Sequence, residues 1–359
     1  MNEYKIRQYR SGDKEAFLSL YSAVMGDEKQ ENWFAWKYKE NPYIDHVAMM
    51  VGVFEETIVG ARPFFALPVS VNGEHEVALQ PGDTMVHPDH RRQGLFTRMT
   101  EQAIERYAGD HPFFFNFPNH RSRSGYLKLD WEPVSERLSY YRVENPESLG
   151  KSRADQRAVQ LLSKISSPIA QGYYHFRDST ASVPSQTNIR TESEPPAKEL
   201  ATLYRSSTPD KIHVLRDEQF YQWRFNNPDW EYTTYIIYGE TNPEAAIITG
   251  TSDNSDCVTT KFTDIIPLEN PSNDALRGLF SRVLTDHTET DLFVAPPQGI
   301  PDSVLREFGF HADTVPPLSF LTTQTTHVVR ALTNSWTQNG LDITDPDNWH
   351  MTFVEEDTS

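Results

Sequence analysis

Cysteine is almost absent from the chain, with Cys257 the only one among 359 residues. An internal disulfide and a cysteine-based metal cluster are therefore excluded, and we expect no metal site. Long apolar runs are also missing. No stretch approaches the roughly 20 residues that a membrane-spanning helix needs, and residues 1–5 open no apolar signal segment. These absences predict a cytoplasmic protein without a membrane span.

Positive charge is scarce as well, with 33 Lys and Arg against 51 Asp and Glu and a net charge of −18. Nucleic-acid-binding proteins and proteins on anionic membranes need a cationic face, so both classes are disfavoured. Lysine is the rarer cation, with 11 lysines and 22 arginines. A salt-rich cytosol is one explanation for this balance, and an ordinary acidic protein is the other. A local cluster of arginines is informative in such a chain.

The length and the alternation of strand and helix signals predict two α/β domains. The first should contain strands at 4–7, 64–71, 83–86 and 113–117, a hairpin of 49–54 and 58–62, and helices from 13, at 33–38 and at 95–107. A connecting segment with one apolar helix candidate should follow, at 146–187 and 158–165. The chain should end in a mostly polar tail with a strand candidate, at 331–359 and 349–354.

The most informative stretch is the basic turn Arg91-Arg92-Gln93-Gly94 between a strand and a helix. Glycine lets a ligand approach the backbone closely, and the first turn of the following helix has N–H groups without intrahelical partners. Together with the two arginines, these groups are typical of an anion-binding loop. An ordinary solvated turn is the alternative.

A second polar segment, Pro118-Asn119-His120-Arg121, follows the next strand, which is apolar at nearly every position. Such a strand is buried on both faces of a sheet. If it lies beside the strand before the basic turn, both exits open on one sheet edge. Such an edge is the usual place of a ligand cleft in α/β proteins.

The second half of the chain repeats the first. Five features recur in the same order at offsets of 183 to 187, among them Trp36 with Trp223, which we expect in the core. Gly278 repeats Gly94 at an offset of 184, but Ala-Leu-Arg stands where the first copy has Arg-Arg-Gln. Packing alone gives no reason for that difference. We therefore predict two copies of one fold, with a ligand site in the first only; the expected ranges are 1–145, a connection at 146–187, 188–330, and the tail at 331–359.

The turn Arg91 to Phe96 resembles the acyl-CoA pyrophosphate loop of the GNAT acetyltransferase superfamily, Q/R-x-x-G-x-G/A, with Phe96 in place of the small last residue. A second GNAT pattern, N-x-x-A-x-x-F-Y-x-K-L-G-F, resembles the stretch from Asn119 to Trp131, with Gly125 in the Phe position and Tyr126 kept. The order of elements is also similar over about residues 3–143. This resemblance implies a mixed central sheet flanked by helices in each of two tandem GNAT-like folds, the second one degenerate.

The resemblance implies an acetyl-CoA-dependent N-acetyltransferase that acts on the amine of a small or sugar-like acceptor by direct attack. Tyr126 is the expected proton donor to the leaving thiolate. The general base is open between Asp83, His87 and an ordered water. The resemblance assigns to acetyl-CoA the strand end, the turn, the first helical turn and one later residue: Met85, Val86, Arg91, Arg92, Gln93, Gly94, Leu95, Phe96, Thr97, Arg98 and Asn119.

Two other functions are compatible with the same residues. One is a non-catalytic acyl-CoA-binding or regulatory protein. The other is an acyl or aminoacyl transferase that acts on cell-envelope precursors, with the acceptor between the two copies. Retained thiol release from acetyl-CoA with an amine would distinguish the enzyme from the binding protein.

Overall fold

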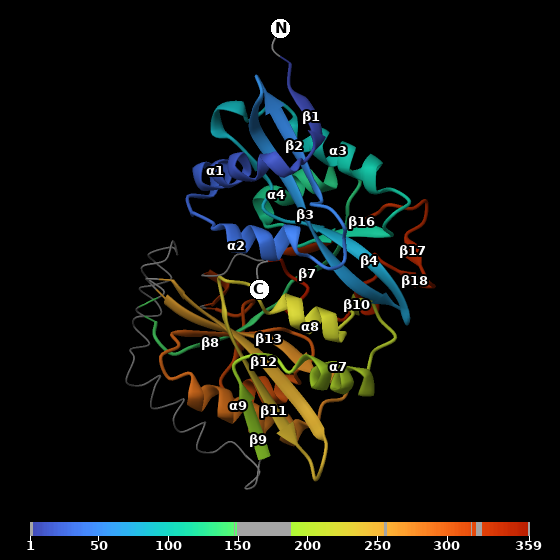
Figure 1. Ribbon diagram of the computed structural model, residues 1–359. Helices are drawn as coiled ribbons and strands as arrows, with labels where there is room; N and C mark the ends of the chain where they lie inside the picture. Colours follow the sequence, from blue (N-terminus) through green and yellow to red (C-terminus); the bar gives the residue numbers. More distant parts are fainter. Residues whose placement is uncertain are drawn as a thin grey trace.

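The computed structural model describes residues 3–146, 148, 188–254, 257–316, 318–320 and 325–357. Within these ranges the chain forms a nine-stranded and a seven-stranded sheet, which lie in two bodies stacked end to end (Figure 1). No helix in the described parts is both long and apolar enough to cross a membrane. The helix expected over 158–165 lies outside the described residues.

The first half of the chain follows the predicted order of elements. It contains β1 (Lys5–Gln8), η1 (Ser11–Asp13), α1 (Lys14–Met25), α2 (Glu31–Phe34) continued by the π-helical η2 (Ala35–Lys39), β2 (Met49–Phe54), β3 (Thr57–Val71), β4 (Glu74–Pro81), β5 (Met85–Val86), η3 (Pro88–His90), α3 (Leu95–Tyr107), β6 (Phe113–Asn116), α4 (His120–Leu127), β7 (Glu132–Glu136) and β8 (Tyr140–Val143).

The second half repeats this order. It contains β9 (Asn188–Glu192), α7 (Ala197–Ser206), β10 (His213–Val214), α8 (Glu218–Arg224), β11 (Glu231–Tyr238), β12 (Pro243–Asn254), β13 (Cys257–Ile266), α9 (Asn273–Asp286), β14 (Leu292–Ala295), α10 (Asp302–Glu307), β15 (His311–Ala312), η5 (Leu318–Phe320), β16 (Thr326–Ala331), β17 (Thr337–Gln338), β18 (Leu341–Asp342) and η6 (Pro346–Asn348).

The two sheets exchange one strand each. The first has the order β1-β2-β3-β4-β6-β16-β7, so β16 from the second half lies between β6 and β7. The second has the order β9-β11-β12-β13-β14-β8-β15, so β8 from the first half fills the same position there. The predicted mixed α/β fold in two copies is confirmed. The residue ranges expected for the domains stay a prediction, and the exchange adds that neither sheet is built from one half alone.

Both faces of the first sheet are covered by helices. Along β3 successive side chains point to opposite faces, so Phe64 packs with Met99 of α3 and Phe65 packs in the core that contains Phe17 of α1. α3 presents an apolar stripe to the sheet at four-residue spacing, which is why this segment is an amphipathic helix. The sheet therefore separates an α1 and α2 side from an α3 and α4 side.

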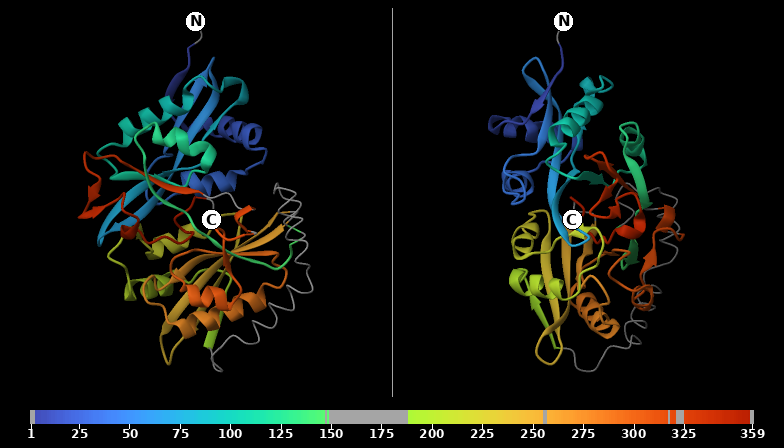
Figure 2. Two further views of the ribbon diagram at one scale, coloured as in Figure 1. Left: turned by 180° about the vertical axis from the view of Figure 1, so that it is seen from behind. Right: turned by 90° about the vertical axis from the view of Figure 1, so that its right-hand side faces the viewer.

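The last residues of the chain are a correction to the sequence analysis. The strand predicted over 349–354 does not form. This segment is irregular, with a turn in which the Thr352 N–H donates a hydrogen bond to the Glu355 carboxylate, and its apolar side chains are buried. Trp349 contacts the first sheet through Phe115, with ring centroids 6.1 Å apart. The C-terminal part, red in Figure 2, thus returns to the first body instead of ending as a free tail.

Candidate active site

The basic turn lies where the first sheet divides. β4 pairs in parallel with β6 at Leu79 and Phe114, whereas β5, which continues the same stretch of chain, pairs with β3. Residues 82–84 between β4 and β5 are not in a strand, so the strand expected over 83–86 is shortened to Met85–Val86. The chain beyond β5 leads directly to the N-terminus of α3.

The backbone of the turn has the geometry of an anion site. Gly94 is the N-cap of α3 with a φ of 74°, and a Cβ at this position would meet nothing within 4 Å. No side chain among the described residues caps α3, so the N–H groups of its first turn have no intrahelical acceptor. Arg91 and Arg92 are exposed beside them. An anion at this helix end gains about 0.3–1 kcal/mol from the helix, and charge-assisted hydrogen bonds add to it.

The other residues predicted to bind acetyl-CoA lie in varied surroundings. Arg98 donates from Nη2 to the backbone oxygen of Tyr4 at 2.8 Å, which ties α3 to the start of β1. Arg91 donates from Nε to the backbone oxygen of Val86 at 3.2 Å. Arg92, Gln93 and Thr97 are exposed, Val86 and Phe96 are half-buried, and Met85 and Leu95 are buried.

The second copy lacks this turn, which corrects the match expected between Gly278 and Gly94. α9 begins at Asn273, so Gly278 is buried inside the helix instead of preceding it. The sequence match at an offset of 184 therefore reflects a similar pattern of buried residues in α3 and α9. Ser272 caps α9 and accepts a hydrogen bond from the Ala275 N–H at 3.3 Å. The Ser272 side chain thus accepts from an N–H group in the first turn of α9, whereas no side chain in the described structure caps the first turn of α3.

Tyr126 lies in α4 and is buried against the start of α3. Its hydroxyl accepts a hydrogen bond from Asn116 Nδ2 at 2.6 Å, so its own proton remains available to donate. Its ring meets Phe96 edge to face, with centroids 5.7 Å apart. A Cβ at Gly125 would lie 3.1 Å from the Phe96 ring, so the glycine permits this close approach.

A buried cation, Arg62 of β3, lies next to Tyr126. The guanidinium carbon is 5.2 Å from the Tyr126 centroid and 4.7 Å from the Phe96 centroid. Arg62 donates from Nη1 to the Thr84 hydroxyl at 3.2 Å, while Nε and Nη2 have no hydrogen-bond partner in the described structure. Burial lowers the pKa of Arg62, which the Tyr126 hydroxyl partly offsets. These donors suit a ligand oxygen.

Asp83 lies in the interruption between β4 and β5, with a left-handed φ of 44°. Its carboxylate accepts hydrogen bonds from Lys37 Nζ at 2.6 Å and from the Tyr38 hydroxyl. Lys37 Nζ also lies 2.9 Å from Asp357 Oδ2. Burial acts to lower the pKa of Lys37, but the two carboxylates outweigh it and the pKa is raised. Burial and the charge of Asp83 raise the pKa of Tyr38. Lys37 is therefore charged and Tyr38 neutral around physiological pH.

Asp83 and Lys37 line a cavity of about 840 Å³ on the α1 and α2 side of the sheet. Both halves of the chain contribute to its wall, which includes Tyr21 and Trp33 from the first half and Trp230 from the second. Carboxylates outnumber lysines in the lining by eight to two. The carboxylates belong to Asp27, Glu28, Asp83, Asp229, Glu231, Asp253, Glu289 and Asp357.

The two remaining predicted residues lie apart from this cavity. His87 is the N-cap of η3 and accepts a hydrogen bond from the Asp89 N–H at 3.4 Å. Asn119 stands before α4 and accepts one from the Ser122 N–H at 3.2 Å. Tyr126 contacts Arg62, and Arg62 donates to Thr84, the residue that follows Asp83. His87 lies beyond β5, at the start of η3.

Comparison with known families identifies the first half. Residues 5–134 match the family model of an acetyltransferase (GNAT) domain. They form a GNAT domain. The matched segment runs from β1 into β7, so it contains the basic turn, Asp83 and Tyr126, and the predicted family is confirmed. No significant match is found among curated proteins.

Solved structures with the same fold span most of the chain. A protein of unknown function from Enterococcus faecalis, described as a probable N-acyltransferase, aligns with 92% of this chain and 73% of its own at 12% identity and a TM-score of 0.63. A GCN5-related N-acetyltransferase from Anabaena variabilis covers the same shares at 11% identity and a TM-score of 0.60. Eis1 from Mycobacterium abscessus aligns at 13% identity with a TM-score of 0.51, over 92% of this chain and 74% of its own. At these identities the likeness shows the fold alone.

Several site residues of the GNAT domain were not predicted from the sequence. Arg62 carried a usable signal, because it is a lone charge in a long apolar strand. Lys37 and Tyr38 lay in an aromatic stretch that was assigned to the core. Asp357 had no local signal, since the C-terminal segment brings it to Lys37 from the far end of the chain.

Proposed function

We propose that this protein is an acetyl-CoA-dependent N-acetyltransferase whose acceptor is a small, positively charged amine. The observation that carries the proposal is a pair of oppositely charged sites, one within the GNAT domain and one between this domain and the second half of the chain. The uncapped N-terminus of α3 with Arg91 and Arg92 suits an anion. The cavity that Asp83 lines on the α1 and α2 side suits a cation.

The pyrophosphate of acetyl-CoA is assigned to the turn before α3. The fit rests on the open N–H groups of the first turn, on the unobstructed space at Gly94, and on the exposed Arg91 and Arg92. Gln93 and Thr97 add exposed polar side chains, and Asn119 remains a predicted contact. Acetyl-CoA supplies a thioester carbonyl for the amine to attack and a thiolate that leaves.

The acceptor is assigned to the acidic cavity. Its volume of about 840 Å³ lies within the usual range of small-molecule sites, roughly 300–1,000 Å³. The surplus of carboxylates favours an amine that carries more than one positive charge. Asp229 and Asp253 come from the second half, so the degenerate copy would help to select the acceptor.

Proton transfer is assigned to Asp83 and Tyr126. Asp83 would take a proton from the acceptor ammonium, because it lines the acceptor cavity. Tyr126 would give its phenolic proton to the leaving thiolate, since Asn116 uses only an acceptor site of the hydroxyl. His87 is not among the residues that line the cavity, and we therefore assign the base to Asp83.

Thiol release from acetyl-CoA tests the proposal. The purified protein would be assayed with amines that carry one, two or three positive charges, and we expect kcat/KM to rise with charge. D229N and D253N should raise KM for the amine at unchanged acetyl-CoA affinity, whereas D274N, an exposed site on α9, is the matched control. Binding of acetyl-CoA without thiol release for any amine would instead support the non-catalytic binding protein.

A further inference from the structure

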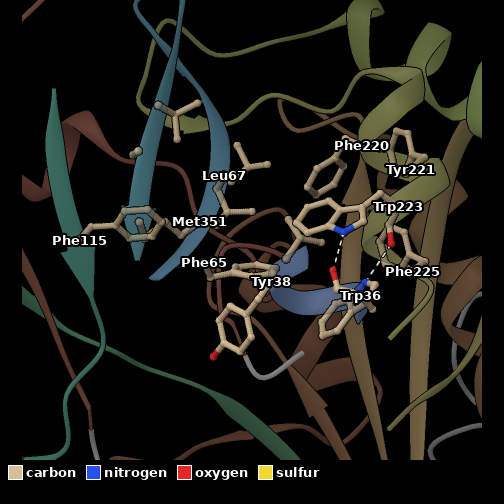
Figure 3. Close-up of a cluster of buried hydrophobic side chains, with 14 of the residues drawn as sticks. Trp36, Tyr38, Phe65, Leu67, Phe115, Phe220, Tyr221, Trp223, Phe225 and Met351 are labelled. Carbon is tan, nitrogen blue, oxygen red and sulfur yellow. Dashed lines mark hydrogen bonds between the residues drawn. The ribbon is translucent and has the colours of Figure 1, made fainter. Parts of the chain in front are cut away.

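The C-terminal segment is held firmly against both halves of the protein. Trp349 packs against Phe113 and Phe115 of the first sheet, and Met351 points into the shared core near Phe115 (Figure 3). Farther along the segment, Glu355 forms a buried ion pair with Arg216 of the second half, Nη2 to Oε1, at 3.1 Å. Asp357 follows within two residues of this anchor, so its position is set by the packing of the whole molecule.

Asp357 ends this segment at the candidate active site. Its Oδ2 lies 2.9 Å from Lys37 Nζ, and the same ammonium is 2.6 Å from Asp83 Oδ2. The exposed fractions of the three side chains are 2% for Lys37, 11% for Asp83 and 14% for Asp357. One buried ammonium therefore joins a carboxylate of the GNAT domain to a carboxylate from the end of the chain.

Gly82 provides the space for this contact. A Cβ added at Gly82 would lie 2.2 Å from Asp357 Oδ2, well inside contact distance. The glycine has no left-handed φ, so alanine is compatible with its backbone. The absence of a side chain at position 82 thus lets the Asp357 carboxylate reach Lys37.

We propose that Asp357 is a positioning residue for acetyl transfer: it holds the Lys37 ammonium, and through it the Asp83 carboxylate, in place at the wall of the acceptor cavity. This inference rests on the proposed function of Asp83 as the base. Asp357 acts on Asp83 through the Lys37 ammonium, which both carboxylates contact.

The charges explain why one ammonium needs two carboxylates. Burial acts to lower the pKa of Lys37, and the charges of Asp357 and Asp83 together outweigh it, so the ammonium stays charged between them. Burial raises the pKa of Asp357 against the Lys37 ammonium, and the charge of Asp83 adds to the rise. The other titratable or charged groups that act on this pair are Tyr21, Tyr38, Arg224, Lys261 and Glu356.

The step that Asp357 supports is a proton transfer. One N–H bond of the acceptor ammonium breaks, its electron pair stays on nitrogen, and the proton moves to the Asp83 carboxylate. The neutral amine then attacks the thioester. The proton leaves Asp83 for solvent through the open cavity before the next turnover.

Two variants test the inference by independent routes. D357N removes the charge and keeps the shape, whereas G82A leaves every titratable group in place and displaces the Asp357 carboxylate. In both we expect kcat to fall about tenfold or more, because the carboxylate is misplaced, while the KM for acetyl-CoA is unchanged. G12A, where a Cβ meets nothing within 4 Å, is the control and should match wild type.

Two outcomes would overturn the inference. One is a wild-type kcat in both D357N and G82A. The other is a parallel loss of turnover and of acetyl-CoA affinity, together with a lowered melting temperature, which is what a purely structural role predicts. If D357N does not fold, G82A carries the test.

A measurement without turnover separates this inference from the proposed function. Carboxyl carbons of ¹³C-labelled aspartate would be observed by NMR at one pH, with the Asp83 signal assigned from D83N. We expect its chemical shift to change in D357N and G82A, but not in G12A, even if no acceptor is found. An unchanged Asp83 signal would refute the role of Asp357, whereas absent thiol release with a changed signal would refute only the acetyltransferase proposal.

Discussion

Trp36 and Trp223 donate hydrogen bonds to each other's backbone: Nε1 of Trp36 lies 3.0 Å from the Trp223 oxygen, and Nε1 of Trp223 lies 2.9 Å from the Trp36 oxygen (Figure 3). Their rings stack with centroids 6.3 Å apart. These residues occupy matching positions in the two copies, and each lies beside the other at the junction. The internal repeat is thus also a contact between the halves.

Replacing either tryptophan should destabilise the protein strongly and non-additively. W36F leaves the buried oxygen of Trp223 without its donor, which costs about 1–3 kcal/mol in addition to the lost packing. W223F in turn leaves the buried backbone oxygen of Trp36 without its donor. In urea unfolding we expect the double variant to lose less than the sum, with a coupling of about 0.5–3 kcal/mol. Additive losses would show that the two hydrogen bonds act independently.

Gly125 and Phe96 should also be energetically coupled. A Cβ at Gly125 would lie 3.1 Å from the Phe96 ring, so G125A should overpack this contact and cost about 1–3 kcal/mol. In an F96A background the same change should cost much less, because the ring is gone. Urea unfolding of the four proteins measures both differences, and an equal cost in the two backgrounds would contradict the contact.

Acetyl-CoA affinity should depend on the arginines of the turn. R91A/R92A removes two exposed guanidinium groups at the open N-terminus of α3, and we expect calorimetry to show at least a tenfold weaker affinity, with a smaller dependence on salt. R106A is the control, because Arg106 lies at the other end of α3 and pairs with Asp110 at 2.9 Å. Equal affinities in the two variants would remove the turn from the cofactor site.

Turnover should depend on the Tyr126 hydroxyl. Y126F keeps the ring against Phe96 and removes only the proton donor, so kcat should fall by about 10²-fold or more while acetyl-CoA affinity is retained. Y140F serves as the control, since its hydroxyl donates to Asp302 in the second half at 2.7 Å. If Y126F and Y140F turn over alike, another group protonates the thiolate.

His213 should make the protein less stable in acid. Burial, reinforced by Arg216, lowers its pKa to about 4, whereas an unfolded histidine titrates near ~6.5. The unfolded chain therefore binds the proton first, and stability is lost as the pH falls from ~6.5 toward 4, by about 2 kcal/mol between pH 7 and pH 5.

The comparison of wild type with H213Q isolates this contribution. His350 and His327 are buried with lowered pKa values and act in the same direction, and Asp264, whose pKa burial raises to about 6, opposes them. These groups are common to both proteins. The pH dependence of urea unfolding should be flatter in H213Q, and identical slopes would contradict a buried neutral His213.

Local patterns predicted the elements of the GNAT domain well because their causes are local. The helix over 95–107 follows from its apolar spacing and from Gly94, and it forms over those residues. Two of the departures from the GNAT motifs, at Phe96 and Gly125, prove to be one exchange of a large for a small residue across a contact. Each of these two departures is therefore explained by the other residue across the contact.

The features that local patterns missed are set by distant pairing. Nothing near Tyr140 indicates that its strand joins β14 of the other sheet, and nothing near Asp357 indicates Lys37. The match of Gly278 to Gly94 failed because a helix start depends on its cap, here Ser272, and not on the apolar pattern that the two helices share.

The exchanged strand has a consequence for synthesis on the ribosome. β6 and β7 are made early, but the strand between them is residues 326–331. The first sheet therefore keeps a gap between β6 and β7 until residues 326–331 have emerged. A polypeptide that stops before this strand exposes the unpaired edges of β6 and β7, which are templates for wrong pairing with other chains. The first sheet is thus completed only after the seven strands of the second sheet have been made.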